Sequence, residues 1–120
     1  MIILKQQSIE ALESASDYLA RMINAIPDII KAYRIGELNK ASSDMILLSE
    51  GLQWLNEVLN LTKDFHKIDN IEVKEIYFEF IEALENDDSV LLADLLEYEL
   101  LPKIQHWENL LNESLANYAN

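Results

Sequence analysis

Cysteine is absent from this 120-residue sequence, and glycine and proline occur only twice each. Without cysteine the chain has no disulfide, thiolate metal site or cysteine nucleophile, and its composition suits a reducing compartment. The two glycines, Gly36 and Gly51, stand alone, whereas a loop that cradles phosphate needs several glycines together. A nucleotide site of that kind is therefore excluded, and the shortage of turn-forming residues favours long regular elements.

Basic residues are also scarce. Nine Lys and Arg stand against 22 Asp and Glu, which gives a formal net charge of −13. Residues 1–69 carry ten acids and seven bases, whereas residues 70–120 carry twelve acids and two bases. Nucleic acids and anionic membranes bind through cationic surfaces, so both partners are disfavoured. Surface charge most often serves solubility, and the functional alternative is a net-basic partner.

Long hydrophobic runs are missing as well. No stretch approaches the ~20 apolar residues of a membrane-spanning helix. The apolar start at residues 1–4 is shorter than the apolar core of a signal peptide, roughly 7 to 15 residues. Half of all residues are apolar, however, and the length is that of one domain, which we expect to cover residues 1–120. We therefore expect a cytoplasmic protein with an ordinary hydrophobic core.

What the chain does contain is a helical repeat of apolar residues. Over two long stretches an apolar residue recurs after three and then four positions, which matches one stripe of an α-helix. The stripes are Leu12, Ala15, Leu19, Met22, Ile26, Ile29 and Tyr33 in the first stretch and Leu38, Ala41, Met45, Leu48, Leu52, Leu55 and Leu59 in the second. Each stripe needs a covering surface, so the sequence predicts long helices packed side by side.

The first helix is expected over residues 8–34, with Ser8 as its N-cap. Proline lacks an N–H and its ring crowds the carbonyl four residues earlier, so we expect a kink or a break near Pro27. Gly36 supplies the left-handed residue that ends many helices, and the second helix, residues 37–62, follows after a very short connection. These two helices are therefore expected to be antiparallel neighbours.

Two further helices complete the expected fold. Asp69, with Glu72 three residues later, resembles a capping box and opens the third helix after a loop at residues 63–70. The fourth helix begins after a break at residues 86–89 and runs toward Tyr118. We therefore predict an all-α domain that is an antiparallel four-helix bundle with up-down-up-down order.

The third helix separates apolar from acidic side chains. Its expected apolar face is Val73, Tyr77, Phe80 and Leu84, and the nearly opposite face is Glu72, Glu75, Glu79 and Glu82. Phe78 falls off the apolar face, and Trp54 widens the face of the second helix. Aromatic residues rimmed by charge are the usual anchors of protein interfaces. Because Trp54 and Trp107 also fit core positions, Phe78, with Glu75 and Glu79 beside it, is the better candidate for an exposed contact.

Leucines surround the start of the fourth helix, where residues 90–101 read VLLADLLEYELL. A helix that is apolar all round is either central in its domain or covered by another chain. Counting back along the apolar stripe places Glu97 at a core position, with Asp94 one turn earlier and Tyr98 continuing the Asp94 row. Buried carboxylates would need donors, a partner chain or raised pKa values. The alternative is that Glu97 flanks the stripe and reaches water, and Pro102 can shift the register here.

Tests for catalysis and metal binding are negative at the level of sequence. Di-iron bundles carry Glu-x-x-His pairs, but lysine stands three residues before both His66 and His106. No nucleophile, oxyanion donor or substrate pocket is indicated. We therefore expect a protein that is not an enzyme and holds no cofactor or metal. A small-molecule or metal site lined by Asp94, Glu97 and Tyr98 stays open as an alternative, because perturbed carboxylates cluster at sites.

Two segments, residues 50–55 (EGLQWL) and 92–102 (LADLLEYELLP), resemble those of a family of small, acidic, all-helical proteins in low-GC Gram-positive bacteria. The function of that family is uncharacterised, so the resemblance implies no activity and no role for Asp94 or Glu97. More distantly, the size, acidity and four-helix layout are similar to those of the flagellar export chaperone that guards flagellin before secretion. That similarity implies binding of a peptide helix without catalysis.

We therefore expect a non-catalytic protein-interaction module. It would bind a net-basic amphipathic helix, or a second copy of itself through the fourth helix, with apolar anchors for affinity and the acidic second half for orientation. A secretion or flagellar-type export chaperone is the nearest alternative. The candidate contact and polar-network residues are Trp54, Phe78, Glu75, Glu79, Asp94, Glu97 and Tyr98.

Overall fold

The computed structural model describes residues 5–118, apart from the side chains of Asn70 and Val73. Within that range all regular structure is helical, which confirms the all-α class. The elements are α1 (Lys5–Arg34), α2 (Leu38–Leu61), the 3-10 turn η1 (Lys63–Phe65), α3 (Asn70–Glu85), α4 (Ser89–Asp94), the π-helical η2 (Leu95–Leu100) and α5 (Leu101–Tyr118). Because α4, η2 and α5 follow one another directly, they form one rod. The expectations about residues 1–4 and the Val73 side chain fall outside the described parts.

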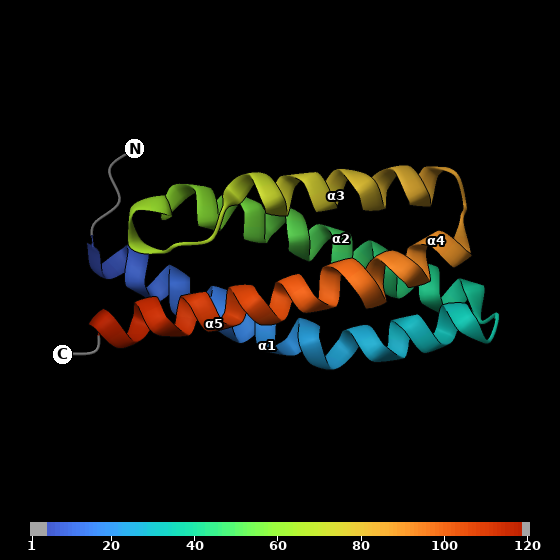
Figure 1. Cartoon of the computed structure of the whole chain (residues 1–120), viewed down its shortest axis with the longest axis horizontal. Helices are drawn as coiled ribbons and strands as arrows, with labels where there is room; N and C mark the ends of the chain where they lie inside the picture. The colour runs from blue at the N-terminus through green and yellow to red at the C-terminus, as the bar shows by residue number, and fades with distance from the viewer. Residues whose placement is uncertain (1–4, 119–120) are drawn as a thin grey trace.

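Figure 1 shows how the helices lie along one another. α1 runs the length of the molecule, α2 returns beside it, and α3 and the α4–η2–α5 rod then pass along it again in turn. α1 packs against α2, α4 and α5, whereas α2 packs against α3, and α3 against α4. The Cα atoms span 48 × 25 × 19 Å. The helices therefore share one elongated core.

The two apolar stripes predicted for the first helices form about half of that core. All of their members are buried except Leu38, which lies in the first turn of α2 and is 48% exposed. Trp107 of α5 and Phe80 of α3 are the largest side chains in the fully buried set. None of the helices formed by residues 5–118 is long and apolar enough to cross a membrane.

The connection between α1 and α2 is a tight cap at Gly36. Its φ of 84° is a left-handed conformation that glycine adopts without strain. The Glu37 N–H donates to the Ala32 carbonyl at 2.9 Å, and the Gly36 N–H donates to the Tyr33 carbonyl at 3.4 Å. This pair of bonds is a Schellman motif. The predicted end of the first helix at Gly36 is confirmed.

Two aspartates begin the later helices. A side-chain oxygen of Asp69 accepts from the Ile71 N–H at 2.9 Å, and one of Asp88 accepts from the Leu91 N–H at 3.0 Å. Each carboxylate thereby satisfies a backbone donor that the first helical turn leaves unpaired. In the turn before α4, Asp87 has a φ of 53°, so this turn uses a left-handed residue that is not glycine. The predicted cap of the third helix, Asp69, is confirmed.

α1 continues through Pro27 as a single helix. The interpretation of two separate helices is therefore wrong, while a kink within the one helix stays a prediction. Ile26 and Ile29, on either side of the exposed proline, are 0% and 4% exposed. Apolar burial contributes roughly 25 cal/mol per Å², so packing on both sides of Pro27 offsets the hydrogen bond that proline removes.

A wide turn precedes Pro102. η2 is π-helical, and the Leu101 N–H donates to the Leu96 carbonyl five residues earlier. In a regular α-helix the proline ring would crowd the Tyr98 carbonyl and leave it without a donor. A π-helical turn accommodates the ring because it holds one more residue than an α-helical turn.

This extra residue moves the core stripe of the rod. Leu96, Leu100 and Ile104 are fully buried at four-residue spacing, whereas the Glu97 side chain is 37% exposed. The interpretation of Glu97 as a core residue is therefore wrong, because counting at α-helical spacing steps from Leu100 to Glu97 instead of to Leu96. The alternative, in which Glu97 flanks the stripe and reaches water, is confirmed.

α3 buries a face that differs in part from the predicted one. Ile76, Phe80 and Ala83 are 3%, 0% and 1% exposed, whereas Tyr77 is only half-buried. The prediction of Phe80 is confirmed, and Tyr77 and Leu84 pack against the core while only partly buried. Ile76 and Ala83, which the prediction left out, complete the buried stripe. Glu79 lies toward the α4–η2–α5 rod.

Candidate functional site

A groove runs between α3 and the α4–η2–α5 rod. It consists of three adjoining hollows, of which the largest measures about 370 Å³, and Glu99 lines all three. We call this surface the acidic groove and define it by Glu79, Glu82, Leu91, Leu95, Glu99 and Lys103.

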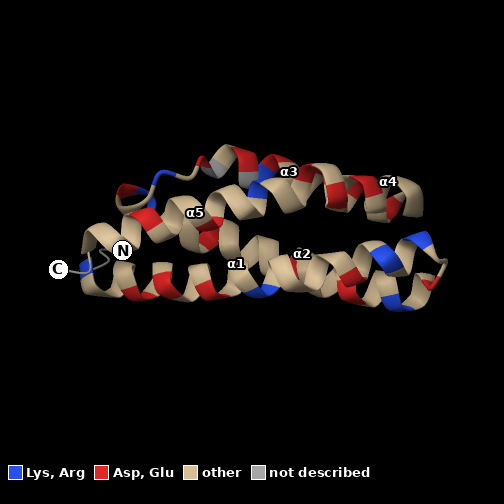
Figure 2. Ribbon diagram, turned by 60° about the horizontal axis from the view of Figure 1, so that its bottom comes forward, with Lys and Arg blue, Asp and Glu red and all other residues tan. Residues whose placement is uncertain are grey.

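The acidic groove has an apolar floor between carboxylate walls. Leu95 is 8% exposed and Leu91 is 43% exposed, so Leu91 offers apolar surface to a ligand. Glu79 and Glu82 stand on the α3 side, and Glu99 stands on η2. Figure 2 shows acidic residues repeated along α3. An apolar strip rimmed by one sign of charge suits an amphipathic partner of opposite charge.

Glu79 and Glu99 face each other across this groove. The pKa of Glu79 is raised above its ordinary value, first by burial and then by the charge of Glu99 and a hydrogen bond between the two carboxyl groups. The positive charge of Lys103 acts in the opposite direction. Two carboxyl groups this close hold a proton more tightly than either would alone.

Lys103 closes one end of the groove. Its Nζ lies 3.2 Å from Glu72 Oε1, which joins α5 to α3. The two side chains are 39% and 41% exposed, and exposed ion pairs contribute about 0–1 kcal/mol. Lys103 is the only base among the described residues that line the three hollows. The negative charge of the walls is therefore largely uncompensated within the groove.

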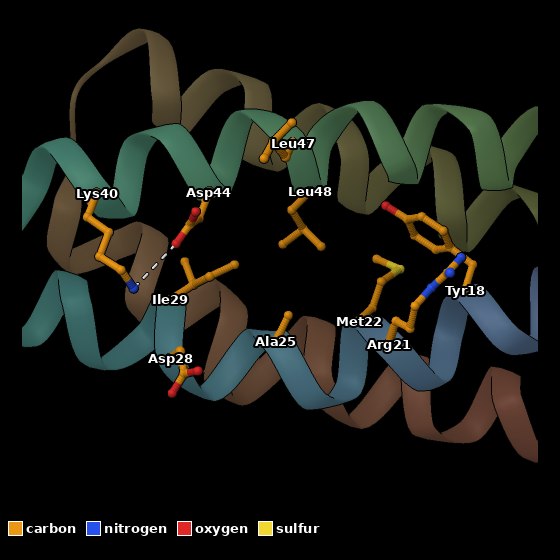
Figure 3. A pocket seen from close by; sticks show the side chains of 10 residues that line it. All are labelled: Tyr18, Arg21, Met22, Ala25, Asp28, Ile29, Lys40, Asp44, Leu47 and Leu48. Carbon is orange, nitrogen blue, oxygen red and sulfur yellow. Dashed lines mark ion pairs between the residues drawn. The ribbon is translucent and has the colours of Figure 1, made fainter.

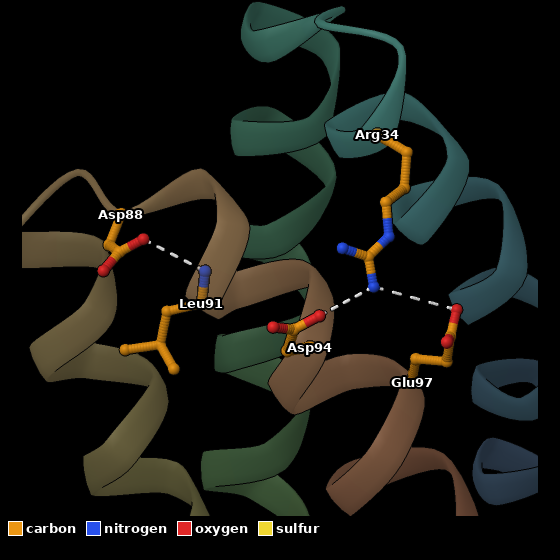
Figure 4. A network of polar contacts seen from close by, with 5 residues as sticks. All are labelled: Arg34, Asp88, Leu91, Asp94 and Glu97. Atoms are coloured by element: carbon orange, nitrogen blue, oxygen red, sulfur yellow. Dashed lines mark hydrogen bonds and ion pairs between the residues drawn. The ribbon is translucent and has the colours of Figure 1, made fainter.

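Asp94 and Glu97 are brought together by a cation at the surface, as Figure 4 shows. Arg34 Nη2, at the end of α1, lies 2.8 Å from Asp94 Oδ1 and 3.9 Å from Glu97 Oε1. The Asp94 side chain is 47% exposed, so neither predicted carboxylate is buried. This network connects α1 to the start of the rod.

Tyr98 continues the row of Asp94, as predicted, and is 68% exposed. The two residues line a hollow of about 290 Å³ with Leu91. A hydrogen bond to Glu97, followed by the Glu97 charge, raises the pKa of Tyr98. Among the described residues no three His, Asp or Glu are grouped to hold a metal ion. The alternative site for a small molecule stays a prediction. Its two carboxylates, Asp94 and Glu97, already contact Arg34.

His66 holds the end of α2. The Ile68 N–H donates to its Nδ1 at 3.0 Å, so Nε2 carries the proton and donates to the Leu59 carbonyl at 2.7 Å. Both ring nitrogens therefore serve the backbone, which assigns this histidine a structural role.

The two candidate aromatic anchors lie on different helices. Phe78 is 55% exposed on α3, which confirms it as an exposed residue, and its ring contacts Tyr77 with centroids 5.8 Å apart. Trp54 is 38% exposed on α2, so its interpretation as a core residue is wrong, whereas Trp107 is fully buried as that interpretation requires. Trp54 packs on Tyr18 of α1, with ring centroids 5.4 Å apart. Gly51, one turn before Trp54, leaves the space that the Tyr18 hydroxyl fills.

Sequence reasoning did not single out Glu99, Lys103 or Arg34. Glu99 offered a signal, because it interrupts the leucine-rich run at residues 90–101 as Glu97 does. Lys103 and Arg34 offered no such signal, because only the fold brings them to Glu72 and Asp94. Arg34 and Asp94 are 60 residues apart in sequence.

Comparison with known proteins identifies a family but no function. No curated protein and no solved structure matches the chain significantly. One family model, described as a domain of unknown function (DUF8042), matches residues 10–110. That match covers α2, α3, α4 and η2 completely and most of α1 and α5. The chain therefore belongs to the DUF8042 family.

Proposed function

We propose that the protein is a non-catalytic interaction module of the cytoplasm, built as an antiparallel up-down-up-down four-helix bundle, whose acidic groove binds a net-basic amphipathic helix of another protein. The observation that carries this proposal is the exposed apolar floor at Leu91, enclosed by carboxylates from both sides. Lys103 is the one base among the described residues that line the groove.

Binding in this groove would combine two contributions. Apolar side chains on one face of the partner helix would cover Leu91 and Leu95, which removes apolar surface from water. Lysine or arginine side chains beside that face would approach Glu82 and the Glu79–Glu99 pair. A cation beside the pair would lower the raised pKa of Glu79 and offset the repulsion between the two carboxyl groups.

The fold supports this role because the walls of the groove stand on helices. Glu99 lies on η2, and two other residues of η2, Leu96 and Leu100, are fully buried. Glu79 lies one residue before the fully buried Phe80. Side chains carried by packed helices keep their separation, which reduces the ordering cost of binding. Phe78 is not part of the groove floor, so we expect it to contribute less than Leu91.

A synthetic peptide tests the proposal. The probe is a fluorescein-labelled helix of about 18 residues, or five turns, with leucine on one face and lysine on both flanks. The dissociation constant of this peptide is measured by fluorescence anisotropy at low and at high salt. The control is a peptide with the same residues in scrambled order. We expect the amphipathic peptide to bind at least about tenfold more tightly than the scrambled one, because only the former presents an apolar face.

Variants locate the binding site. Leu91→Gln and the pair Glu79→Gln with Glu99→Gln should each weaken binding of the amphipathic peptide. The matched control changes Glu10 and Glu13 to Gln, because these exposed acids lie on α1. Equal binding of the scrambled peptide, or an equal loss in the control variant, would show that the peptide senses net charge and would refute the proposed groove.

A further inference from the structure

Lys103 supplies the positive charge at one end of the acidic groove. The hollow at this end measures about 50 Å³, whereas the hollow that holds Leu91 and Leu95 measures about 370 Å³. A space of this size admits a few water molecules but no lysine or arginine side chain from a partner. The groove therefore offers room at its apolar end and almost none at the end that holds Lys103. The smaller hollow is lined by Glu72, Glu75, Ile76, Glu79, Glu99 and Lys103.

Lys103 fills this end because its side chain crosses from one wall of the groove to the other. It stands on α5, and its Nζ lies 3.2 Å from Glu72 Oε1 on α3. Burial raises the pKa of Glu79, and the charge of Lys103 opposes that rise, so the ammonium group acts on a second carboxyl group of α3 as well. The protein thus holds its own lysine among the carboxylates that the proposed function assigns to a base of the partner.

A lysine beside a hollow does not always close it. The hollow of about 310 Å³ between α1 and α2 has Lys40 at one end, as Figure 3 shows. Lys40 Nζ lies 3.7 Å from Asp44 Oδ2, four residues later on the same helix. This ion pair stays at the edge, so it does not cross the apolar middle at Met22 and Leu48. Lys103 differs because the carboxylate that it contacts stands on the opposite wall.

The ion pair between Lys103 and Glu72 is easily opened. Both side chains are partly exposed, so water can solvate the two charges once they separate, and exposed ion pairs contribute little to stability. Glu72 also lies in the first turn of α3, where the helix dipole stabilises a carboxylate. Glu72 therefore keeps a favourable environment when Lys103 moves away.

We infer that Lys103 is a built-in competitor for the acidic groove: its ammonium group occupies the place of a partner base and moves into solvent when that base binds. This inference rests on the proposed function, because it names the step that regulates binding in the same groove. A simple cation would have to displace Lys103 without covering Leu91. The contact therefore favours partners that carry both an apolar face and a base.

Peptide binding to variants of the full chain tests the inference. The probe is the labelled amphipathic peptide of leucine and lysine described above, at low salt. Lys103→Met removes the ammonium group but keeps a flexible, unbranched side chain. The matched control is Lys74→Met, which makes the same change in net charge on α3 at an exposed lysine that does not line the three hollows. We expect Lys103→Met to bind the peptide at least about threefold more tightly than Lys74→Met. Equal affinities would overturn the inference.

NMR of the lysine side chains shows whether Lys103 moves. The lysines are converted to isotope-labelled dimethyl-lysine, which keeps the positive charge, and the Lys103 signal is identified by its loss in Lys103→Met. Glu72→Gln gives the position of this signal when the ion pair is absent. Added peptide should move the Lys103 signal toward that position and leave the Lys74 signal unchanged. A lysine that only adds charge to the groove, without being displaced, would not show this movement.

The outcomes separate this inference from the proposed function. A peptide that binds while the Lys103 signal keeps its position refutes the competitor and leaves the groove as a binding site. A peptide that binds no better than its scrambled form refutes the groove, and the role of Lys103 with it. Movement of the Lys103 signal, together with tighter binding to Lys103→Met than to Lys74→Met, supports both.

Discussion

Replacement of Gly51 by alanine tests the close contact between α1 and α2. A Cβ at this position would overlap the hydroxyl and ring carbons of Tyr18, so the tyrosine would have to move. Tyr18 packs on Trp54 with ring centroids 5.4 Å apart. The displacement would therefore also remove the ring that supports Trp54.

Two opposing effects set the size of the change. Alanine favours a helix interior over glycine by about 0.8–1.0 kcal/mol. Moving Tyr18 loses an aromatic pair that contributes about 0.5–1.5 kcal/mol and the burial of half a ring, about 1 kcal/mol. We expect Gly51→Ala to lower the free energy of unfolding by about 1 kcal/mol in the wild type. In a Tyr18→Ala background the overlap is gone, and the same change should raise it by about 1 kcal/mol.

The assay is urea unfolding, followed by circular dichroism, of the wild type, the two single variants and the double variant. This cycle should show an interaction of about 2 kcal/mol between the two positions. The reasoning would be refuted if Gly51→Ala changed stability by the same amount in both backgrounds, because Tyr18 would then not lie over Gly51.

Further variants test the turns and the groove. Gly36→Ala should lower the free energy of unfolding by about 1–2 kcal/mol in urea, since no atom lies within 4 Å of the added Cβ and the cost is that of the backbone alone. Asp87→Gly should raise it by about 0.5–1 kcal/mol, and a decrease would show that the Asp87 side chain itself holds the turn. Because the pKa of Glu79 is raised in the fold, the proton on Glu79 stabilises the protein below its ordinary pKa of 4.5, and that contribution is lost as the pH rises through the raised pKa. Glu79→Gln should therefore reduce the loss of stability between pH 4.5 and pH 7 in urea unfolding, whereas Glu10→Gln should leave that loss unchanged.

Much of the fold follows from local rules. Apart from Leu38, the members of the first two stripes are buried because helical spacing alone brings them to one side. Gly36 ends α1, and Asp69 begins α3, because each supplies a conformation or a hydrogen bond that few other residues supply. Pro27 marks the limit of such rules, since a helix buried on both sides of a proline continues through it.

The candidate site was harder to predict because it depends on register and on pairing across helices. One additional residue in η2 decides that Leu96, and not Glu97, enters the core. Leaving Ile76 and Ala83 out of the α3 stripe likewise hid the approach of Glu79 to Glu99. No feature of the sequence indicates that these two carboxylates meet, because they lie on separate helices and the fold alone joins them.

The π-helical turn makes the last rod a junction between two helical registers. Deleting one residue within η2 would rotate α4 by about 100° relative to α5. Leu92 and Leu96 would leave the core, and Asp94 would turn away from Arg34. Such a deletion would therefore rebuild one wall of the acidic groove rather than shorten a helix. Any redesign that straightens this rod into an ideal helix must choose new core residues for the half that precedes Pro102, and a helical sequence aligned to it needs a one-residue gap there.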